Sequence, residues 1–394
     1  MTDHRVNGFR VGGIAAGIKP KQKRDLGLIF SAAPASVAGV FTRNQIQAAP
    51  VVLDRDRISS GVSQAVIVNS GIANCCTGER GMRDAAAMTR MTAEHLGLND
   101  DKVLVASTGV IGAWLPMKKI QAAIPRLVGG VRPEGFDDFA EAIMTTDTVP
   151  KLVTRRGVLN DIPFTVTGAA KGAGMIHPDM ATMLAFICTD AGATAGELDR
   201  VLRTGVERSL NRITIDGDTS TNDTTLLFAN GRSGATLRTI KDKDLFQATV
   251  HDVMETLARQ LVKDGEGATK LVTITVKGAR SQQSAHTVAD TVAKSALVKT
   301  ALFGEDANWG RIVAAVGRAG VPIEPDRIKV FFDGVLVFAK GGGVDGLNEN
   351  LINKVLKQSE YAISIDLGMG SSKVTVITCD LSVEYVQINA DYRT

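Results

Sequence analysis

The residue of this sequence best placed for chemistry is Thr182. It follows the small residue Ala181 at the end of a glycine-rich polar segment, residues 171–181, and it opens the apolar run 183–188. Cleavage of the Ala181–Thr182 bond would free an α-amine beside the hydroxyl, and threonine enzymes use such an amine as their general base. The alternative is a turn followed by a core strand in which Thr182 is only a β-former. Taken alone, the segment favours that alternative.

A second candidate is the pair Thr108 and Gly109. These residues follow a predicted strand, 103–107, and precede a helix predicted from about Pro116, where proline is allowed in the first turn. A backbone amide at a strand-to-helix turn lacks a helical partner, so it could donate a hydrogen bond to an oxyanion. An ordinary turn explains the pair equally well.

Other kinds of site find little support. None of the five histidines has the i, i+4 spacing of a helical metal site, so we expect no metal. A Gly-x-Ser-x-Gly elbow is absent, which weakens a Ser-His-Asp hydrolase. The glycine run 265–270 lacks the spacing of a phosphate-binding P-loop. His177 lies close to Thr182, and we interpret it as a structural loop residue.

Composition indicates an α/β enzyme with many tight turns. The chain has 394 residues, forty glycines and a net charge of only +3, so no nucleic-acid-binding surface is expected. Neither a signal sequence nor a membrane span is evident, and the four cysteines have no CxxC spacing. We therefore expect a cytoplasmic protein.

The hydrophobic pattern indicates two domains, residues 1–280 and 281–394. In the first, strands are predicted at 51–53, 64–69 and 103–107, and a hairpin at 158–170 turns at Asn160-Asp161. Thr194 and Glu197 have the spacing of a capping box. Further predictions are a helix at 288–302 and a hairpin at 329–338 that turns at Asp333-Gly334. The polar segment 216–224 either binds a ligand or forms a hydrogen-bond network, and the second is favoured.

Several segments together resemble one family, the ornithine acetyltransferases of arginine biosynthesis. The central one is Lys-Gly-x-Gly-Met-Ile-His-Pro-x-Met-Ala-Thr-Met-Leu at residues 171–184, which resembles the family's cleavage and nucleophile motif. The other matches follow in order along the chain, at residues 41–50, 68–74, 107–112, 144–148, 216–224, 264–270, 303–312 and 388–394. Any one of them is weak evidence, but the ordered set covers essentially the whole chain. The ordered set therefore favours Thr182 as a nucleophile over Thr182 as a β-former in a core strand.

The resemblance implies an N-terminal-nucleophile-like α/β fold with two sheets and helices, plus a smaller C-terminal α/β domain. It implies self-cleavage into an α chain, 1–181, and a β chain, 182–394, assembled as an α2β2 heterotetramer. The implied reaction moves an acetyl group from N2-acetylornithine to L-glutamate by ping-pong kinetics through an acetyl-threonine. Whether acetyl-CoA is also a donor stays open, and no other cofactor is expected.

The resemblance also assigns residues. Thr182 would be the nucleophile, and Thr108 with Gly109 would form the oxyanion hole. Substrate contacts would come from Thr145, Lys171, Thr182, Glu266, Asn389 and Thr394. Each of the last assignments has a structural alternative, such as a solvated charge for Lys171, helix caps for Glu266 and Asn389, and a frayed end for Thr394. The sequence departs from the family pattern at Ile72, at Cys75-Cys76 and at Asp179, which adds charge near the cleaved bond.

Two other functions are considered. One is a related N-terminal-nucleophile amidase or peptidase, in which water is the final acyl acceptor. The other is a regulatory protein that binds a metabolite without turning it over. The acetyltransferase is favoured because the substrate-contact positions, and not only the nucleophile, match the family.

Overall fold

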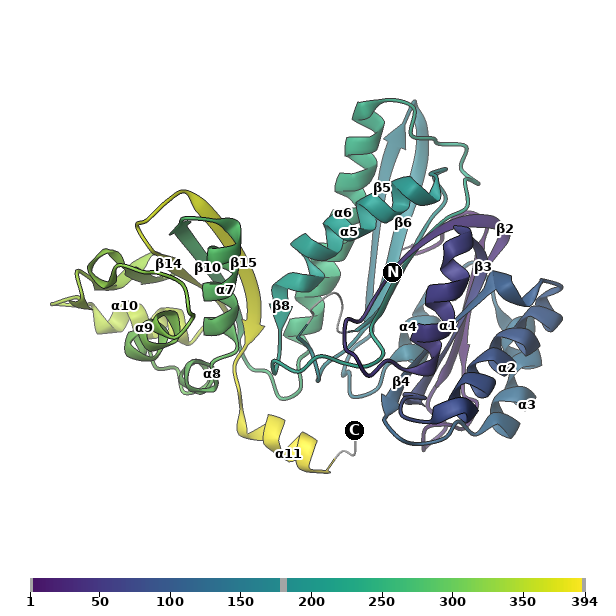
Figure 1. Ribbon diagram of the computed structural model, residues 1–394, viewed down its shortest axis with the longest axis horizontal. Coiled ribbons are helices and arrows are strands. Elements are labelled where there is room, and N and C mark those ends of the chain that lie inside the picture. The colour runs from purple at the N-terminus through teal and green to yellow at the C-terminus, as the bar shows by residue number, and fades with distance from the viewer. Residues whose placement is uncertain (1–2, 178–182, 392–394) are drawn as a thin grey trace. The chain divides into compact units, whose positions relative to one another are not determined.

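A computed structural model describes residues 3–177 and 183–391 of the chain. The described residues fall into two compact units. The first contains the residues up to Asn211 together with Asp218–Leu261, and the second contains Arg212–Gly217 and the residues from Val262 onward. In each unit, helices pack on a β-sheet (Figure 1). The predicted α/β class with a smaller second α/β unit is therefore confirmed, and two sheets are present.

The boundary between the units differs from the one expected near residue 280. Strand β10 (Leu271–Ala279) pairs in parallel with β14 (Glu360–Asp366) and antiparallel with β15 (Ser372–Cys379). These backbone hydrogen bonds tie residues 271–279 to the second unit. The apolar pattern of β10 identified a strand, but it carried no information about which sheet the strand would join.

The first unit contains an eight-stranded sheet with the strand order β4-β3-β2-β9-β7-β6-β5, in which β1 also pairs with β2. The neighbours β3 and β4 are parallel, as are β7 and β9, and the other pairs are antiparallel. The strands are β1 (Phe9–Ile14), β2 (Leu26–Phe41), β3 (Val62–Ile72), β4 (Val103–Val110), β5 (Lys151–Leu159), β6 (Ile162–Lys171), β7 (Leu184–Thr189) and β9 (Thr224–Ala229).

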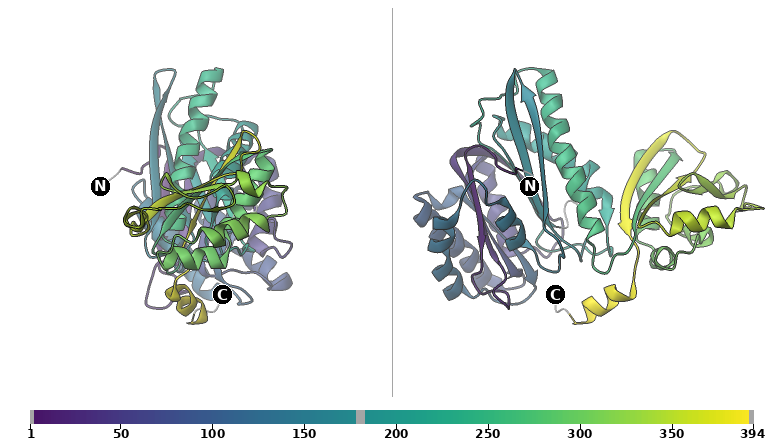
Figure 2. Two further views of the ribbon diagram at one scale, coloured as in Figure 1. Left: turned by 90° about the vertical axis from the view of Figure 1, so that its left-hand side faces the viewer. Right: turned by 180° about the vertical axis from the view of Figure 1, so that it is seen from behind.

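Helices cover both faces of this sheet. Along β3, Val66 and Val68 pack with α4 (Phe136–Ile143) in one core. Ala65 and Ile67 pack with α2 (Gly78–Leu96) and α3 (Met117–Gly130) in another. This alternation follows from the two-residue period of a strand. Helix α6 lies along β5 and β6 (Figure 2). The helices are α1 (Ala49–Arg57), α2 (Gly78–Leu96), α3 (Met117–Gly130), α4 (Phe136–Ile143), α5 (Ala195–Arg208) and α6 (Ile240–Lys263).

The strand predicted at 51–53 is wrong, because these residues lie in helix α1. Pro50 occupies the first turn of this helix, a position where its missing N–H costs nothing. Asp54 is fully buried, and its carboxylate accepts the backbone N–H of Val105 at 3.0 Å. That contact with β4 fixes the segment as a helix, whereas a three-residue apolar run is ambiguous by itself.

Other local signals are confirmed. The hairpin of β5 and β6 turns at Asn160 and Asp161, which both have positive φ. Thr194 and Glu197 form both hydrogen bonds of a capping box at the start of α5. Strand β7 is completely buried, as its apolar sequence predicted.

The second unit contains a seven-stranded sheet with the order β13-β12-β11-β14-β10-β15-β8. Helix α7 lies against β10 and β15 (Figure 1). Besides β10, β14 and β15, its strands are β8 (Ile213–Thr214), β11 (Lys329–Phe332), β12 (Val335–Ala339) and β13 (Gly342–Gly343). Its helices are α7 (Gln282–Ala293), α8 (Ala296–Phe303), α9 (Trp309–Gly317), α10 (Glu349–Leu356) and α11 (Val383–Asp391).

Two predictions for this unit have different outcomes. The hairpin at Asp333-Gly334 is confirmed by the pairing of β11 with β12. The helix predicted at 288–302 is instead the end of α7 followed by α8, because the Ser295 hydroxyl accepts the backbone N–H of Val298 and starts a new helix. Across residues 3–177 and 183–391, the helices are too short or too polar to span a bilayer.

Candidate active site

The glycine-rich motif connects two neighbouring strands of the first sheet. Lys171 is the last residue of β6 and pairs with Leu184, the first residue of β7. The predicted nucleophile Thr182 and the predicted cleavage partner Ala181 lie outside the described residues. Met183, directly after them, is buried, and its carbonyl accepts the N–H of Thr224 at 3.0 Å. The ends of β6, β7 and β9 therefore meet where the chain resumes after the motif.

Lys171 joins two of the other predicted site residues. Its ammonium group donates a hydrogen bond of 2.6 Å to Thr145 Oγ1 and one of 3.2 Å to Thr108 Oγ1. The Lys171 side chain is only 9% exposed, so it is not the solvated loop charge considered as an alternative. Residues from β4, from the loop after α4 and from β6 are thus brought together, as the resemblance implied for a substrate site.

A carboxylate that was not singled out from the sequence anchors this cluster. Asp147 Oδ1 lies 2.6 Å from Lys151 Nζ and accepts the N–H of Gly172 at 2.7 Å. Its Oδ2 accepts the N–H of Thr145 at 2.9 Å and lies 4.0 Å from Lys171 Nζ. Burial by itself would raise the pKa of this carboxyl, but the ammonium groups of Lys171 and Lys151 lower it to about 2. Asp147 is therefore ionised and fixes the backbone on both sides of the cluster.

Thr108 and Gly109 lie within β4, not at a turn after it. Strand β4 extends beyond residue 107 because it continues in parallel pairing with Gly71 and Ile72, across an irregularity in the register. Gly109 has a φ of +128°, and a Cβ there would stand 2.2 Å from the carbonyl carbon of Gly71. The backbone of β3 can approach β4 this closely only because residue 109 is glycine. The oxyanion role of Thr108 and Gly109 stays a prediction.

The polar segment before β9 supports this strand end. Asn222 donates from Nδ2 to the carbonyl oxygens of Ala73, at 2.6 Å, and of Ser107, at 2.8 Å. Its own amide oxygen accepts the hydroxyl of Thr221 at 2.7 Å. These contacts agree with the favoured interpretation, a side-chain-to-backbone network, and they hold the residue that precedes Thr108.

Asp223, in the same segment, is buried, and its position was not anticipated. Its Oδ2 has no hydrogen-bond partner among the described residues. Burial raises the pKa of this carboxyl well above its usual range, although the hydroxyl of Ser220, the charge of Lys171 and the hydroxyl of Thr42 act in the opposite direction. Burial therefore favours the neutral form of Asp223, which directly precedes the residue bound to the Met183 carbonyl.

Two further predicted contacts meet in the second unit. Asn389, on α11, donates from Nδ2 to Glu266 Oε2 at 2.8 Å. Glu266 is buried in the turn between α6 and β10. Asn389 lies inside α11 and does not cap it, so it is available to orient the Glu266 carboxylate. Thr394 lies outside the described residues.

No metal-binding cluster of three or more His, Cys, Asp or Glu side chains occurs in residues 3–177 and 183–391. The adjacent thiols of Cys75 and Cys76 are free, with their sulfur atoms 3.7 Å apart. Neither contacts the Lys171 cluster in the interactions described above. The side chains of the Lys171 cluster itself carry hydroxyl, ammonium and carboxylate groups.

The described site thus combines an α/β fold with a buried lysine that binds two threonine hydroxyls at the start of the glycine-rich motif. The profile of the ArgJ family matches residues 10–394, and the chain belongs to this family. It is 51% identical over 391 residues to the arginine biosynthesis bifunctional protein ArgJ of Geobacter sulfurreducens, covering 99% of this chain and 100% of that protein. It is 42% identical to the ArgJ protein of Rhizobium meliloti, with 99% and 96% covered.

Two solved structures are also similar to part of the chain in sequence. The ornithine acetyltransferase of Mycobacterium tuberculosis, crystallised with ornithine, is 43% identical, with 46% of this chain and 98% of that chain covered and a TM-score of 0.44. An ArgJ structure from Bacillus halodurans is 47% identical, with 45% and 92% covered and a TM-score of 0.43.

Proposed function

We propose that this chain is an acetyltransferase that moves an acetyl group from N2-acetylornithine to L-glutamate, with Thr182 carrying the group between two half-reactions. Membership of the ArgJ family supports the reaction class. The observation that carries the proposal is the buried ammonium of Lys171, held on the hydroxyls of Thr145 and Thr108 at the start of the segment that contains Thr182.

The nucleophile would be generated by the chain itself. The Thr182 hydroxyl attacks the carbonyl carbon of Ala181, the C–N bond breaks, and the acyl group moves to oxygen as an ester. Water then hydrolyses this ester, leaving a carboxylate on Ala181 and a free α-amine on Thr182. The reference pKa of such an amine is about 8, so it is mostly protonated at neutral pH. Partial burial would lower this pKa and make the amine a competent base.

The first half-reaction uses both groups of Thr182. Its hydroxyl attacks the acetyl carbonyl of N2-acetylornithine while the α-amine takes the proton. The tetrahedral oxyanion would be stabilised by Thr108 and Gly109, and one such donor is typically worth about 3 kcal/mol. The same amine then gives the proton to the leaving nitrogen, so ornithine departs and acetyl-Thr182 remains. The α-amino group of glutamate attacks this ester in the second half-reaction.

Charged residues would orient the amino-acid substrates. Lys171 suits a substrate carboxylate, since it is buried and has an ammonium group with three donors. Glu266 suits a substrate ammonium and is oriented by Asn389. Thr145 and Thr394 complete the proposed set of contacts.

The α chain 1–181 and the β chain from 182 would stay associated as an α2β2 heterotetramer in the cytoplasm. N2-acetylornithine and glutamate would be the substrates without another cofactor, and acetyl-CoA would be a second acetyl donor.

The test supplies N2-acetylornithine to the purified protein with and without glutamate, and measures ornithine, N-acetylglutamate and acetate. We expect N-acetylglutamate to form in step with ornithine. Thr182→Ala should abolish transfer, whereas Thr182→Ser, which keeps a hydroxyl, should retain part of it.

Two results would replace the proposal. Acetate release that does not respond to glutamate would identify an amidase with water as acceptor. Saturable binding of acetylornithine without any product would identify a metabolite-binding protein.

A further inference from the structure

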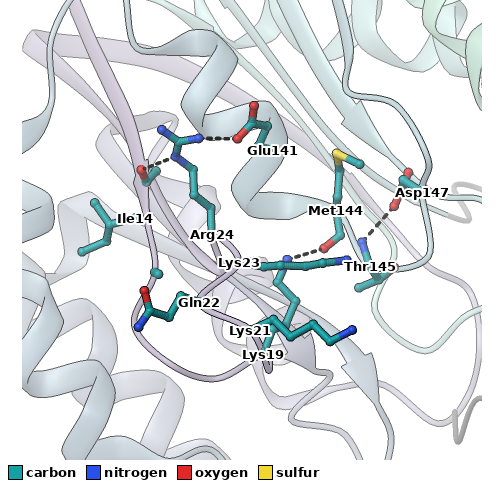
Figure 3. Close-up of a pocket in the computed structure, with 12 residues that line it drawn as sticks. Ile14, Lys19, Lys21, Gln22, Lys23, Arg24, Glu141, Met144, Thr145 and Asp147 are labelled. Atoms are coloured by element: carbon teal, nitrogen blue, oxygen red, sulfur yellow. Dashed lines mark hydrogen bonds and ion pairs between the residues drawn. The ribbon is translucent and has the colours of Figure 1, made fainter.

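A cavity of about 690 Å³ adjoins the Lys171 cluster within the first unit (Figure 3). Thr145 and Asp147 line it on the side of the cluster, and four cations line it elsewhere, namely Lys19, Lys21, Lys23 and Arg24. Its volume is typical of sites for ligands larger than a single amino acid. Residues 19–24, Lys-Pro-Lys-Gln-Lys-Arg, are the densest basic run of the chain.

Thr145 belongs both to the lining of the cavity and to the Lys171 cluster. The Thr145 hydroxyl accepts from Lys171, and its backbone N–H donates to Asp147. The pKa of Lys19 reflects the same proximity. Burial lowers it to about 8, and among the weaker influences the charges of Lys23 and Lys171 lower it further while that of Asp147 raises it. A ligand in the cavity would therefore have one end beside Thr145 and the other among the lysines.

The cations of the cavity are not equivalent. Arg24 pairs with Glu141 and with Asp138, so its charge is balanced. Lys19 donates to the carbonyl oxygen of Met144 at 2.9 Å. Lys21 and Lys23, in contrast, are exposed and form no hydrogen bond or ion pair within the described residues. These two ammonium groups provide the unbalanced positive charge at the rim.

The loop that carries these lysines is held in a defined conformation. The buried carboxylate of Asp25 accepts the backbone N–H groups of Ala16, Ile18 and Lys19 at 2.6 to 2.8 Å. Lys21 has a φ of +59° and the next residue, Gln22, one of +53°. Two successive left-handed residues with side chains cost energy that surrounding contacts must offset, which suits a loop that presents side chains for binding.

We propose that Lys21 and Lys23 bind the phosphate groups of a phosphate-bearing acetyl thioester, of which acetyl-CoA is the probe, while its acetyl end lies beside Thr145. This inference rests on the proposed function and assigns the second acetyl donor its own site. The Thr182 oxygen would attack the thioester carbonyl, the C–S bond would break, and the sulfur would leave as a thiol with the proton of the hydroxyl. Glutamate would then take the acetyl group as before.

The experiment compares two thioesters as donors to glutamate, acetyl-CoA and the phosphate-free S-acetyl-N-acetylcysteamine. In the Lys21→Glu/Lys23→Glu variant, we expect the ratio of the acetyl-CoA KM to the KM of the small thioester to rise about tenfold, because attraction to the phosphates becomes repulsion. Lys241→Glu is the matched control. Lys241 is also exposed without a partner in the described structure, but it lies on α6 and does not line the cavity.

A second measurement does not depend on turnover. The Kd of coenzyme A itself, determined by calorimetry, should rise in the double variant and with added salt in the unaltered enzyme. Lys21→Gln/Lys23→Gln, which only removes the charges, should give a smaller increase. Thermal unfolding of each variant verifies that the fold is retained.

The outcomes separate this inference from the proposed function. An enzyme that exchanges acetyl groups between acetylornithine and glutamate, but does not use acetyl-CoA, contradicts the inference and the assignment of acetyl-CoA as a second donor, and leaves the exchange reaction in place. The inference alone is contradicted if the KM ratio and the Kd of coenzyme A are equal in the unaltered enzyme and the double variant. Absence of the exchange reaction would instead contradict the proposed function, and the Kd measurement would still test the anion site.

Discussion

Lys171 and Asp147 carry opposite charges and are both buried, yet Lys171 Nζ and Asp147 Oδ2 lie 4.0 Å apart. The carboxylate accepts its closest ammonium hydrogen bond from Lys151, at 2.6 Å, while Lys171 donates to two hydroxyls. Asp147 thus balances part of the charge of Lys171 without occupying the ammonium hydrogens that hold Thr145 and Thr108. An ammonium that is already buried and held in this way can bind an anionic group of a substrate at a lower desolvation cost than an ammonium that is still hydrated.

Substitution of Lys171 tests the cluster directly. Lys171→Met keeps the length of the side chain but removes its charge and donors, and we expect kcat/KM for acetyl transfer to fall about 100-fold or more. Lys171→Arg keeps the positive charge, but its planar guanidinium cannot donate to the two hydroxyls with the geometry of an ammonium. We therefore expect this variant to retain only part of the activity. Steady-state kinetics on material of known cleavage state measures both. A Met variant with nearly unaltered kcat/KM would remove Lys171 from the site.

Asp147 should make stability depend on pH in the acid range. Its pKa is about 2 when folded, against an ordinary value of 3.8, so the unfolded chain takes up the proton first as the pH falls. The stabilisation from this difference, of the order of 2 kcal/mol, is present above about pH 4 and is lost as the pH falls toward 2. Urea unfolding of Asp147→Asn should show a large loss of stability at pH 7 that becomes smaller near pH 3. A loss of equal size at both values would contradict this account.

Asp223 should have the opposite dependence. Its pKa is raised in the folded protein, so above about pH 4 the unfolded chain releases a proton that the folded chain keeps. Ionisation of the unfolded chain then lowers the free energy of unfolding as the pH rises. Asp223→Asn cannot release a proton, and its stability between pH 4 and 7 should therefore fall less steeply, or rise more steeply, than that of the unaltered protein. Parallel curves from denaturant unfolding across this range would show that Asp223 is ionised when folded.

Gly109 should tolerate no side chain. A Cβ there would lie 2.2 Å from the backbone of Gly71, and φ is +128°, so Gly109→Ala should cost about 3 kcal/mol or more of stability. Gly112 is the matched control, since its φ is also positive, at +80°, but no atom lies within 4 Å of the added Cβ. Gly112→Ala should cost only about 1 kcal/mol. Equal effects on the unfolding midpoint would mean that the close contact with Gly71 does not matter.

The sequence predicted those parts of the fold that depend on neighbouring residues. The capping box at Thr194 and the hairpin at Asp333-Gly334 are examples, because a turn or a cap is decided within a few residues. The segment 51–53 was mistaken for a strand because the deciding contact, from Asp54 to Val105, joins residues far apart in the sequence. The domain boundary was misplaced for the same reason.

In the candidate site too, the sequence predicted what local motifs define and missed what burial and distant contacts define. Ordered motifs identified Lys171, Thr145 and Thr108 as members of one site, and the structure brings them together. Asp147 and Asp223 were not singled out, although both lie in those motifs. Their importance comes from burial and from the charges around them, which only the folded chain defines. A buried lysine four residues after an aspartate, as in Lys151 and Asp147, leaves no recognisable mark in the sequence.

The central claim is that Thr182 is freed by self-cleavage and then carries the acetyl group. The most direct measurement is denaturing mass spectrometry of the active enzyme after brief mixing with N2-acetylornithine. We predict two chains that meet at the Ala181–Thr182 bond, with one acetyl group on Thr182 of the second chain that disappears when glutamate is added. An intact chain of 41.6 kDa in fully active material, or an acetyl group on another residue, would contradict the claim.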